Sequence, residues 1–132
     1  NQKVSGFAIF QQRVPGRADQ EAAVPINAGT PLTFFLPFDN TGDFVTTMAL
    51  ANISPTANGA INVVYSNENG LVLANTSLSL PPNGHTAFAL TDVPAIRGQR
   101  GVGRFTITSG DFSALGLRFT GDALTSFRPQ VQ

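Results

Sequence analysis

The stretch INVVYSNENGLVLANTSLSL, residues 61–80, alternates apolar and polar side chains on both sides of an Asn-Gly pair. Ile61, Val63 and Tyr65 share one face of an extended chain, because successive side chains of a strand point to opposite faces. Asn69-Gly70 is the kind of pair that tight hairpin turns prefer, since both residues accept positive φ at low cost. The stretch therefore predicts a β-hairpin with its turn at this pair.

Similar alternation recurs along most of the chain, with turn residues between the runs. The predicted strands, about eight, cover 7–12, 32–36, 44–51, 61–66, 71–80, 86–90, 102–108 and 115–119. Helix signals are confined to Arg17–Val24, a short segment between two prolines that Asp19 is placed to cap. We expect an all-β, antiparallel β-sandwich, immunoglobulin-like or jelly-roll-like, with a closed barrel as the second choice. The 132 residues are about the length of one domain, so residues 1–132 are expected to form a single β-sandwich domain.

Phenylalanine is the main aromatic residue, with eleven copies against one tyrosine and no tryptophan. Its ring carries no polar group, which favours burial between the sheets. The phenylalanines expected in the core are Phe7, Phe10, Phe34, Phe35, Phe44, Phe88, Phe105 and Phe119. Phe34 and Phe35 are neighbours in one strand and must point to opposite faces, so one of them needs cover from a loop or a partner.

Composition excludes several classes of function. Eight basic and eight acidic residues give a net charge of zero, and the charged fraction of 12% is about half the usual ~25%. No basic stripe is present for nucleic acid or acidic membranes, and Arg97, Arg100 and Arg104 are interpreted as a solvated loop and strand edge. The absence of cysteine excludes thiol catalysis, disulfides and thiolate zinc sites. No apolar stretch approaches the ~20 residues that cross a bilayer, so membrane insertion is not expected.

The surface composition favours a location outside the cell. Ser, Thr, Asn, Gln and Gly take the place of the missing charges, as is common in secreted bacterial β-domains. The chain starts at Asn1 without a basic segment followed by an apolar run, which is typical of a processed or excised module. We therefore expect an extracellular or cell-surface domain within a larger secreted protein.

The sequence shows no enzyme motif. His85 is the only histidine, which excludes a two-histidine metal site, and no G-x-S-x-G motif accompanies it. It follows the Asn83-Gly84 turn, so an exposed position is expected. Gly98, Gly101 and Gly103 lack the Lys-Ser pair of a P-loop and are interpreted as a loop leading into a strand. We expect a protein that is not an enzyme.

One short segment, PFDNTGDF at 37–44, concentrates oxygen donors. Asp39, Asn40, Thr41 and Asp43 are hard ligands of the type that calcium prefers, although the spacing is not that of an EF-hand. The same residues are also ordinary turn formers. Two carboxylates held ~5–10 Å apart would suit glycoside hydrolysis. The turn is the preferred interpretation, calcium the alternative, and no other cofactor is expected.

Four segments resemble a β-sandwich accessory module found in secreted, multi-domain proteins of soil bacteria. They are GFAIFQQRVPGRADQEAAVP from Gly6, LPFDNTGDFVTTMALAN from Leu36, LSLPPNGHTAF from Leu78 and LGLRF from Leu115. The resemblance spans most of the chain in the expected order. It implies an accessory domain outside the cell without known catalysis, and it supplies no ligand or functional residues.

Two functions remain open. The first is a module that binds polysaccharide or a cell-surface glycan and so contributes to adhesion. Its candidate contacts are Tyr65, the only residue of the usual sugar-stacking types, with Asn62, Asn67, Glu68 and Arg118 at positions expected to be exposed.

The second function is structural, in assembly of a surface protein or filament through strand-edge pairing. The candidate strand is Gly6–Gln12, which carries apolar residues on both faces and would self-associate through its edge. A central place for this strand within its own sheet would explain the same pattern.

Overall fold

The structure, a computed structural model, describes residues 7–13, 15–16, 18–25 and 32–132. Its strands are β1 (Phe7–Gln12), β2 (Gln20–Pro25), β3 (Thr33–Asp39), β4 (Phe44–Asn52), β5 (Gly59–Asn67), β6 (Val72–Leu80), β7 (His85–Ala89), β8 (Arg100–Ser109), β9 (Phe112–Thr120), β10 (Ala123–Phe127) and β11 (Gln130–Val131). Two single-turn 3-10 helices, η1 (Leu90–Asp92) and η2 (Pro94–Ile96), join β7 to β8. Within these ranges no helix has the length and hydropathy needed to cross a membrane.

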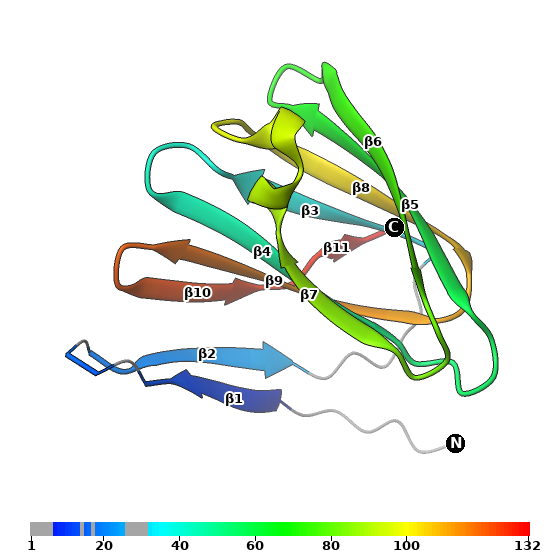
Figure 1. Cartoon of the computed structure of the whole chain (residues 1–132), viewed down its shortest axis with the longest axis horizontal. Helices are drawn as coiled ribbons and strands as arrows, with labels where there is room; N and C mark the ends of the chain where they lie inside the picture. The colour runs from blue at the N-terminus through cyan, green and yellow to red at the C-terminus, as the bar shows by residue number, and fades with distance from the viewer. Residues whose placement is uncertain (1–6, 14, 17, 26–31) are drawn as a thin grey trace.

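Two antiparallel sheets face each other across the core (Figure 1). One has the strand order β11-β3-β8-β5-β6, and the other has the order β10-β9-β4-β7. The predicted all-β sandwich is confirmed, and the two sheets stay separate rather than closing into a barrel. The hairpin predicted from residues 61–80 is the β5–β6 pair, with Gly70 at φ 81° in its turn.

Two of the predicted reversals carry the chain from one sheet to the other. Pro81–Gly84 leads from β6 to β7, and Gly110 leads from β8 to β9. Asn83 adopts φ 56° in the first reversal, and Gly110 adopts φ 75° in the second. Asn and Gly accept this left-handed region with little strain, which explains their place at these corners.

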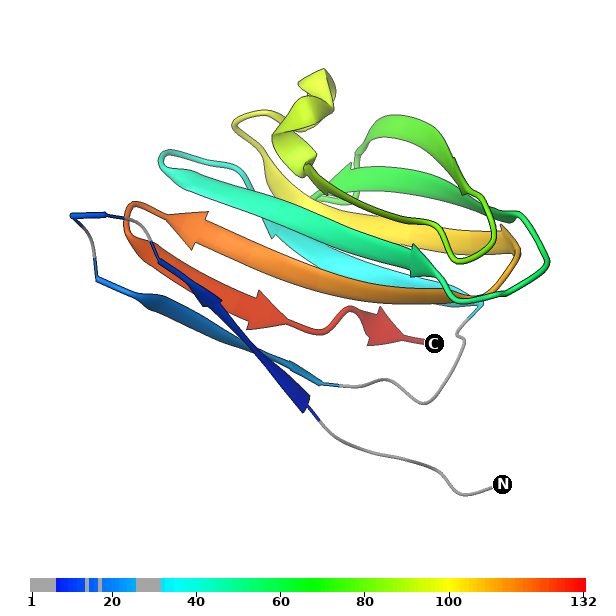
Figure 2. The ribbon, with the colours of Figure 1, turned by 60° about the horizontal axis from the view of Figure 1, so that its bottom comes forward.

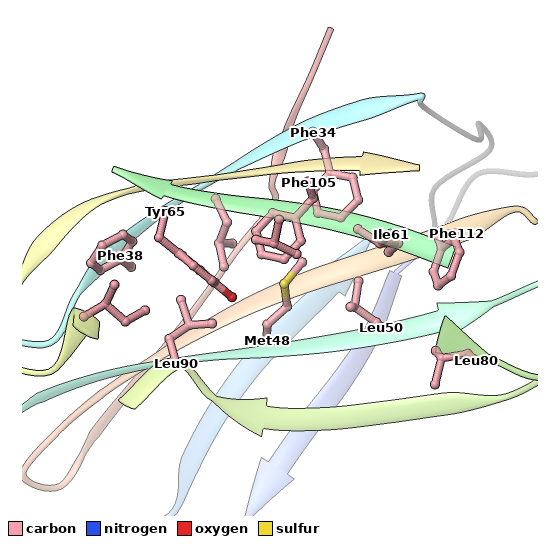
Figure 3. Packing of buried hydrophobic residues seen from close by; sticks show 13 residues of the cluster. Phe34, Phe38, Met48, Leu50, Ile61, Tyr65, Leu80, Leu90, Phe105 and Phe112 are labelled. Atoms are coloured by element: carbon pink, nitrogen blue, oxygen red, sulfur yellow. The ribbon is translucent and has the colours of Figure 1, made fainter. Parts of the chain in front are cut away.

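The core fills the space between the sheets with a row of aromatic rings (Figure 3). The Phe34 and Phe105 rings stack with centroids 4.9 Å apart, and Tyr65 meets Phe105 edge to face at 6.1 Å. These are favourable aromatic geometries. The buried apolar residues are Phe34, Leu36, Phe38, Met48, Leu50, Ile61, Val63, Tyr65, Leu80, Leu90, Ile96, Phe105 and Phe112.

The prediction for the phenylalanines is only partly correct. Of the eight, Phe34 and Phe105 are buried and Phe88 packs half-buried against the core. Phe7 and Phe44 are exposed, whereas Phe35 and Phe119 are half-buried on outer sheet faces. The Phe10 side chain lies outside the described residues. Sandwich sheets bury one face only, so aromatic content alone does not identify the inner row.

The segment 17–24, predicted as a helical turn, is a strand over its described part from Gln20. β2 pairs with β1 in a separate two-stranded sheet, here called the arm, with Phe7 opposite Pro25. Arg13 pairs with Asp19 at 3.3 Å near the turn of the arm, so Asp19 does not cap a helix. Cross-strand pairing therefore overrides the helix preference of the Glu-Ala-Ala sequence.

The arm lies beside the edge strand β10 in both views (Figures 1 and 2). The Gln20 side-chain amide donates to the Asp122 carbonyl, and the Ser126 hydroxyl donates to the Ala23 carbonyl at 2.7 Å. In the described part of the chain, β1 pairs only with β2. The interpretation of β1 as a central strand is therefore wrong, and its second edge is open.

Asn52 is the buried polar residue that holds three segments at one end of the sandwich. Its side-chain amide donates to the carbonyls of Ala57, Leu80 and Pro81, and its side-chain oxygen accepts from the Ser54 and Asp111 amides. Asn52 is also the last residue of the LPFDNTGDFVTTMALAN segment that carries the resemblance, so the role of this residue is to stabilise the fold. Buried polar groups are stabilising only when they are paired in this way.

Phe105→Ala should destabilise the fold by about 3–5 kcal/mol, because the cavity removes contacts with Phe34 and Tyr65. Chemical denaturation with a fluorescence or circular dichroism readout measures the change. Phe7→Ala is the matched control, since Phe7 is 69% exposed and its loss should change stability by less than about 0.5 kcal/mol. Equal effects of the two variants would contradict the assignment of the core.

Asn52→Ala should cost at least about 2 kcal/mol, because it leaves three carbonyls and two amides without their partner. Asn75→Ala, at an exposed position on β6, should leave the free energy of unfolding nearly unchanged. A small loss for Asn52→Ala would show that water replaces the Asn52 side chain.

Candidate functional site

Strand β9 carries two rows of side chains, and Arg118 belongs to the inner one. Gly116 is opposite Met48, and Ala114 is opposite Leu50, both of which are buried in the core. Two-residue periodicity then puts Arg118 on the same inner face. The apolar row Leu115, Leu117 and Phe119 lies on the outer face, half-buried. The expected exposed position of Arg118 is therefore corrected, because its side chain enters the open side of the sandwich.

A cleft of about 260 Å³ opens there between the two sheets. It is lined by Pro37 from β3, Arg118 from β9, and Thr125, Ser126 and Phe127 from β10. β11 pairs only with Phe34 and Phe35, so the β3 edge beyond them is uncovered. Proline suits such an edge, since it has no amide to donate to a ladder. We call this hollow the Arg118 cleft.

The Arg118 guanidinium lies between two aromatic rings. Its central carbon is 6.0 Å from the Phe44 ring centroid and 5.7 Å from that of Phe127, within the range of cation–π attraction. Gly116 makes room for this arrangement, because a Cβ there would lie 2.6 Å from the Phe127 ring. The two rings therefore limit where the guanidinium can go.

One polar atom of this arginine has no partner. The Arg118 Nε is buried, and among the described residues nothing accepts a hydrogen bond from it. A buried N–H without a partner is unfavourable and uncommon in folded proteins. Thr125 is directly opposite Arg118 on β10, so its hydroxyl adds a donor and an acceptor at the rim. The cleft therefore offers a cation, a hydroxyl and aromatic surface side by side.

The charges next to the cleft are partly neutralised. Arg100 lies 3.9 Å from both the Asp39 and the Glu68 carboxylates. The Thr41 hydroxyl donates to Asp39 and holds the pKa of that carboxyl below its usual value; the Thr41 amide, Arg100 and Arg118 act in the same direction, and burial opposes them. Asp39 is thus an ionised, hydrogen-bonded residue, unlike the raised-pKa acid that a glycosidase needs.

The oxygen donors proposed for calcium are largely engaged within the chain. The Asn40 side chain is buried, donating to the Ile96 carbonyl and accepting from the Thr46 amide. One Asp39 oxygen accepts both hydrogen bonds from Thr41. Asp43 is exposed in the same turn. These contacts are those of a folded turn, and the described residues hold no group of three or more His, Cys, Asp or Glu that suits a metal.

The other proposed ligand residues are spread over the molecule. Tyr65 is 1% exposed, and burial raises the pKa of its hydroxyl, which is hydrogen-bonded with Thr76. It is not an exposed sugar platform. Asn62 is exposed on β5, while the Asn67 side-chain oxygen accepts from the Asn69 and Leu71 amides in the hairpin turn. Only Glu68, through Arg100 and Asp39, approaches the region of Arg118.

The remaining sequence candidates have structural or surface positions. His85 is exposed at the start of β7, as expected, beside an apolar hollow with Ala87 and Leu115. Gly101 and Gly103 lie within β8 rather than in a loop before it. A Cβ at Gly101 would lie 1.9 Å from the Ser66 carbonyl oxygen, so only glycine fits this close strand contact.

The two rings that flank Arg118 were present in the sequence but not recognised as part of a site. Phe44 was predicted for the core, and Phe127 lies in a strand that alternation did not identify. The nearest signal was the charged residue in the LGLRF motif.

Comparison of the chain with protein-family models, with curated proteins and with solved structures found no match.

Asp39→Asn should lower stability near neutral pH and reduce the loss of stability in acid. The folded-state pKa of Asp39 lies below its unfolded value of about 3.9. Its contribution is therefore present above that value and is lost as the pH falls through the folded pKa. Thermal unfolding from pH 7 to pH 2 should show the two proteins converging in acid. Asp92→Asn, at an exposed position, is the control, and a constant gap between Asp39→Asn and the parent protein would contradict this role.

Proposed function

We propose that this chain is a non-catalytic binding module, placed outside the cell within a larger secreted protein, that holds a polysaccharide or cell-surface glycan in the Arg118 cleft. The observation that carries the proposal is the Arg118 guanidinium, held between two rings at an open cleft with its buried Nε unpartnered. A sugar presents apolar C–H groups and many hydroxyls, so it needs both an aromatic surface and polar donors.

The parts of the cleft match those needs. Phe127 lines the cleft, and Phe44 flanks Arg118 beside it and is 37% exposed, so part of its ring is available to the apolar face of a sugar. The Arg118 donors and the Thr125 hydroxyl border the same space and suit sugar hydroxyls.

The low pKa of Asp39 argues against this carboxyl as the general acid of a glycosidase. A glycosidase needs a carboxylic acid that is still protonated near neutral pH, and Asp39 is shifted in the opposite direction.

The second candidate function is assembly through strand-edge pairing, and the arm is the observation that favours it. β1 has an open edge, and Phe7 and Ile9 are 69% and 65% exposed beside it. An exposed strand with large apolar side chains is a template for β-augmentation. Size-exclusion chromatography with light scattering tests this function separately, since assembly predicts concentration-dependent self-association that Ile9→Lys abolishes.

Retention of the purified chain on a panel of insoluble and soluble polysaccharides tests the binding function. We expect saturable retention on a subset of polymers, and Phe44→Ala should weaken it about 2- to 10-fold by removing the aromatic wall. Phe7→Ala, which removes a more exposed ring on the arm, should have no effect. Retention should be the same with calcium and with chelator, because Asn40 and Asp39 are already engaged.

Failure of every polymer to retain the protein would overturn the glycan function. A loss of retention with chelator would instead assign calcium to Asp39, Asn40 and Asp43.

A further inference from the structure

Arg118 differs from three other arginines, each of which has a polar partner. Arg13 pairs with Asp19, Arg100 lies between Asp39 and Glu68, and the Arg97 Nε donates to the Thr91 carbonyl. Within the described ranges Arg118 forms no ion pair, and its contacts are the Phe44 and Phe127 rings. Asp39 is close enough to feel its charge, yet Thr41 and Arg100 already engage that carboxylate. The cleft thus holds a cation without an acidic partner.

The unpartnered atom determines which ligand would complete the cleft. A guanidinium donates through two parallel N–H groups along one edge, and the edge that includes Nε matches the two oxygens of a carboxylate. Arg118 Nε is buried without an acceptor among the described residues, so a ligand oxygen would satisfy it once the side chain turns this edge toward the cleft. The flanking rings displace water, which strengthens the attraction between opposite charges.

Resting on the function proposed above, we infer that the ligand of the Arg118 cleft is an anionic glycan, whose sugar carboxylate or sulfate pairs with the Arg118 guanidinium through Nε while the sugar ring lies against Phe44. The Thr125 hydroxyl, directly across the strand pair, is the contact for a neighbouring sugar hydroxyl. A neutral sugar would leave the charge unpaired, so acidic polymers are the preferred ligands.

Binding is measured by isothermal titration calorimetry with the full chain and three soluble probes: polygalacturonate for carboxylates, dextran sulfate for sulfates and dextran as the neutral polymer. We expect an acidic probe to bind at least tenfold more tightly than dextran, and the stronger of the two identifies the anion. Arg118→Gln should weaken that probe tenfold or more, the loss typical of a charge-assisted hydrogen bond.

Arg104→Gln is the matched control. Arg104 is exposed on the outer face of the five-stranded sheet, beside Phe35 and Val64, so its loss removes the same charge outside the Arg118 cleft. Its effect should stay within twofold. Equal losses for the two variants would overturn the inference, since the probe would then respond to overall charge alone.

A second pair of variants tests the role of Arg118 without replacing Arg118 itself, in case Arg118→Gln fails to fold. Thr125 is exposed, so Thr125→Glu should fold normally and place a carboxylate against Arg118. It should weaken the acidic probe at least tenfold, whereas Thr125→Gln should change affinity less than threefold. The melting temperature of each variant confirms that it is folded.

The outcomes separate this inference from the proposed function. Preference for dextran or another neutral polymer, unaffected by Arg118→Gln, would overturn the anionic ligand while leaving a glycan-binding module. Acidic probes that bind equally to the parent protein, Arg118→Gln and Thr125→Glu would also overturn it. Absence of binding to every polymer would remove both proposals.

Discussion

Because Met48 and Leu50 fill the space between the two sheets, the residues opposite them on β9 must also face inward, and Arg118 follows in the same row. Two-residue periodicity leaves no other place for its side chain. The row begins in the core at Phe112, narrows at Gly116 where the Phe127 ring packs, and ends at the open side of the sandwich. The packing that stabilises the fold therefore also places a cation between two rings.

Most of the asparagines that stand out in the sequence stabilise the fold rather than form a site. Asn52 connects three segments, Asn40 ties β3 to η2 and β4, and Asn67 shapes the β5–β6 turn. Each is hydrogen-bonded to the backbone, which satisfies groups that would be costly to leave unpaired at loop ends. Motifs rich in Asn and Gly are thus explained by corners of the sandwich. The candidate site depends instead on Arg118 of the LGLRF segment and on two phenylalanine rings that the sequence did not assign to a site.

Alternation predicted the sandwich, seven of its strands and β1 of the arm, but not β2 or the last two strands. β2 has a helix-favouring composition and becomes a strand only through pairing with β1, while β10 and β11 are short edge strands with weak patterns. The burial of Tyr65 was predictable, since it shares a row with Ile61 and Val63. The inward direction of the Arg118 side chain was not predictable from the sequence. The other row of β9, with Leu115 and Leu117, is the more apolar one and would be expected in the core. Only the pairing register with β4 shows that the row of Arg118 faces inward.

The unpaired guanidinium of Arg118 is the group that we expect to bind an anionic sugar. Nuclear magnetic resonance of the arginine Nε–H groups, followed while trigalacturonate is added, observes this contact itself. We expect the Arg118 Nε–H signal to shift in a saturable way and to exchange more slowly with water, whereas the signal of the exposed Arg104 stays in place. An unchanged Arg118 signal, or equal shifts for all arginines, would contradict the claim.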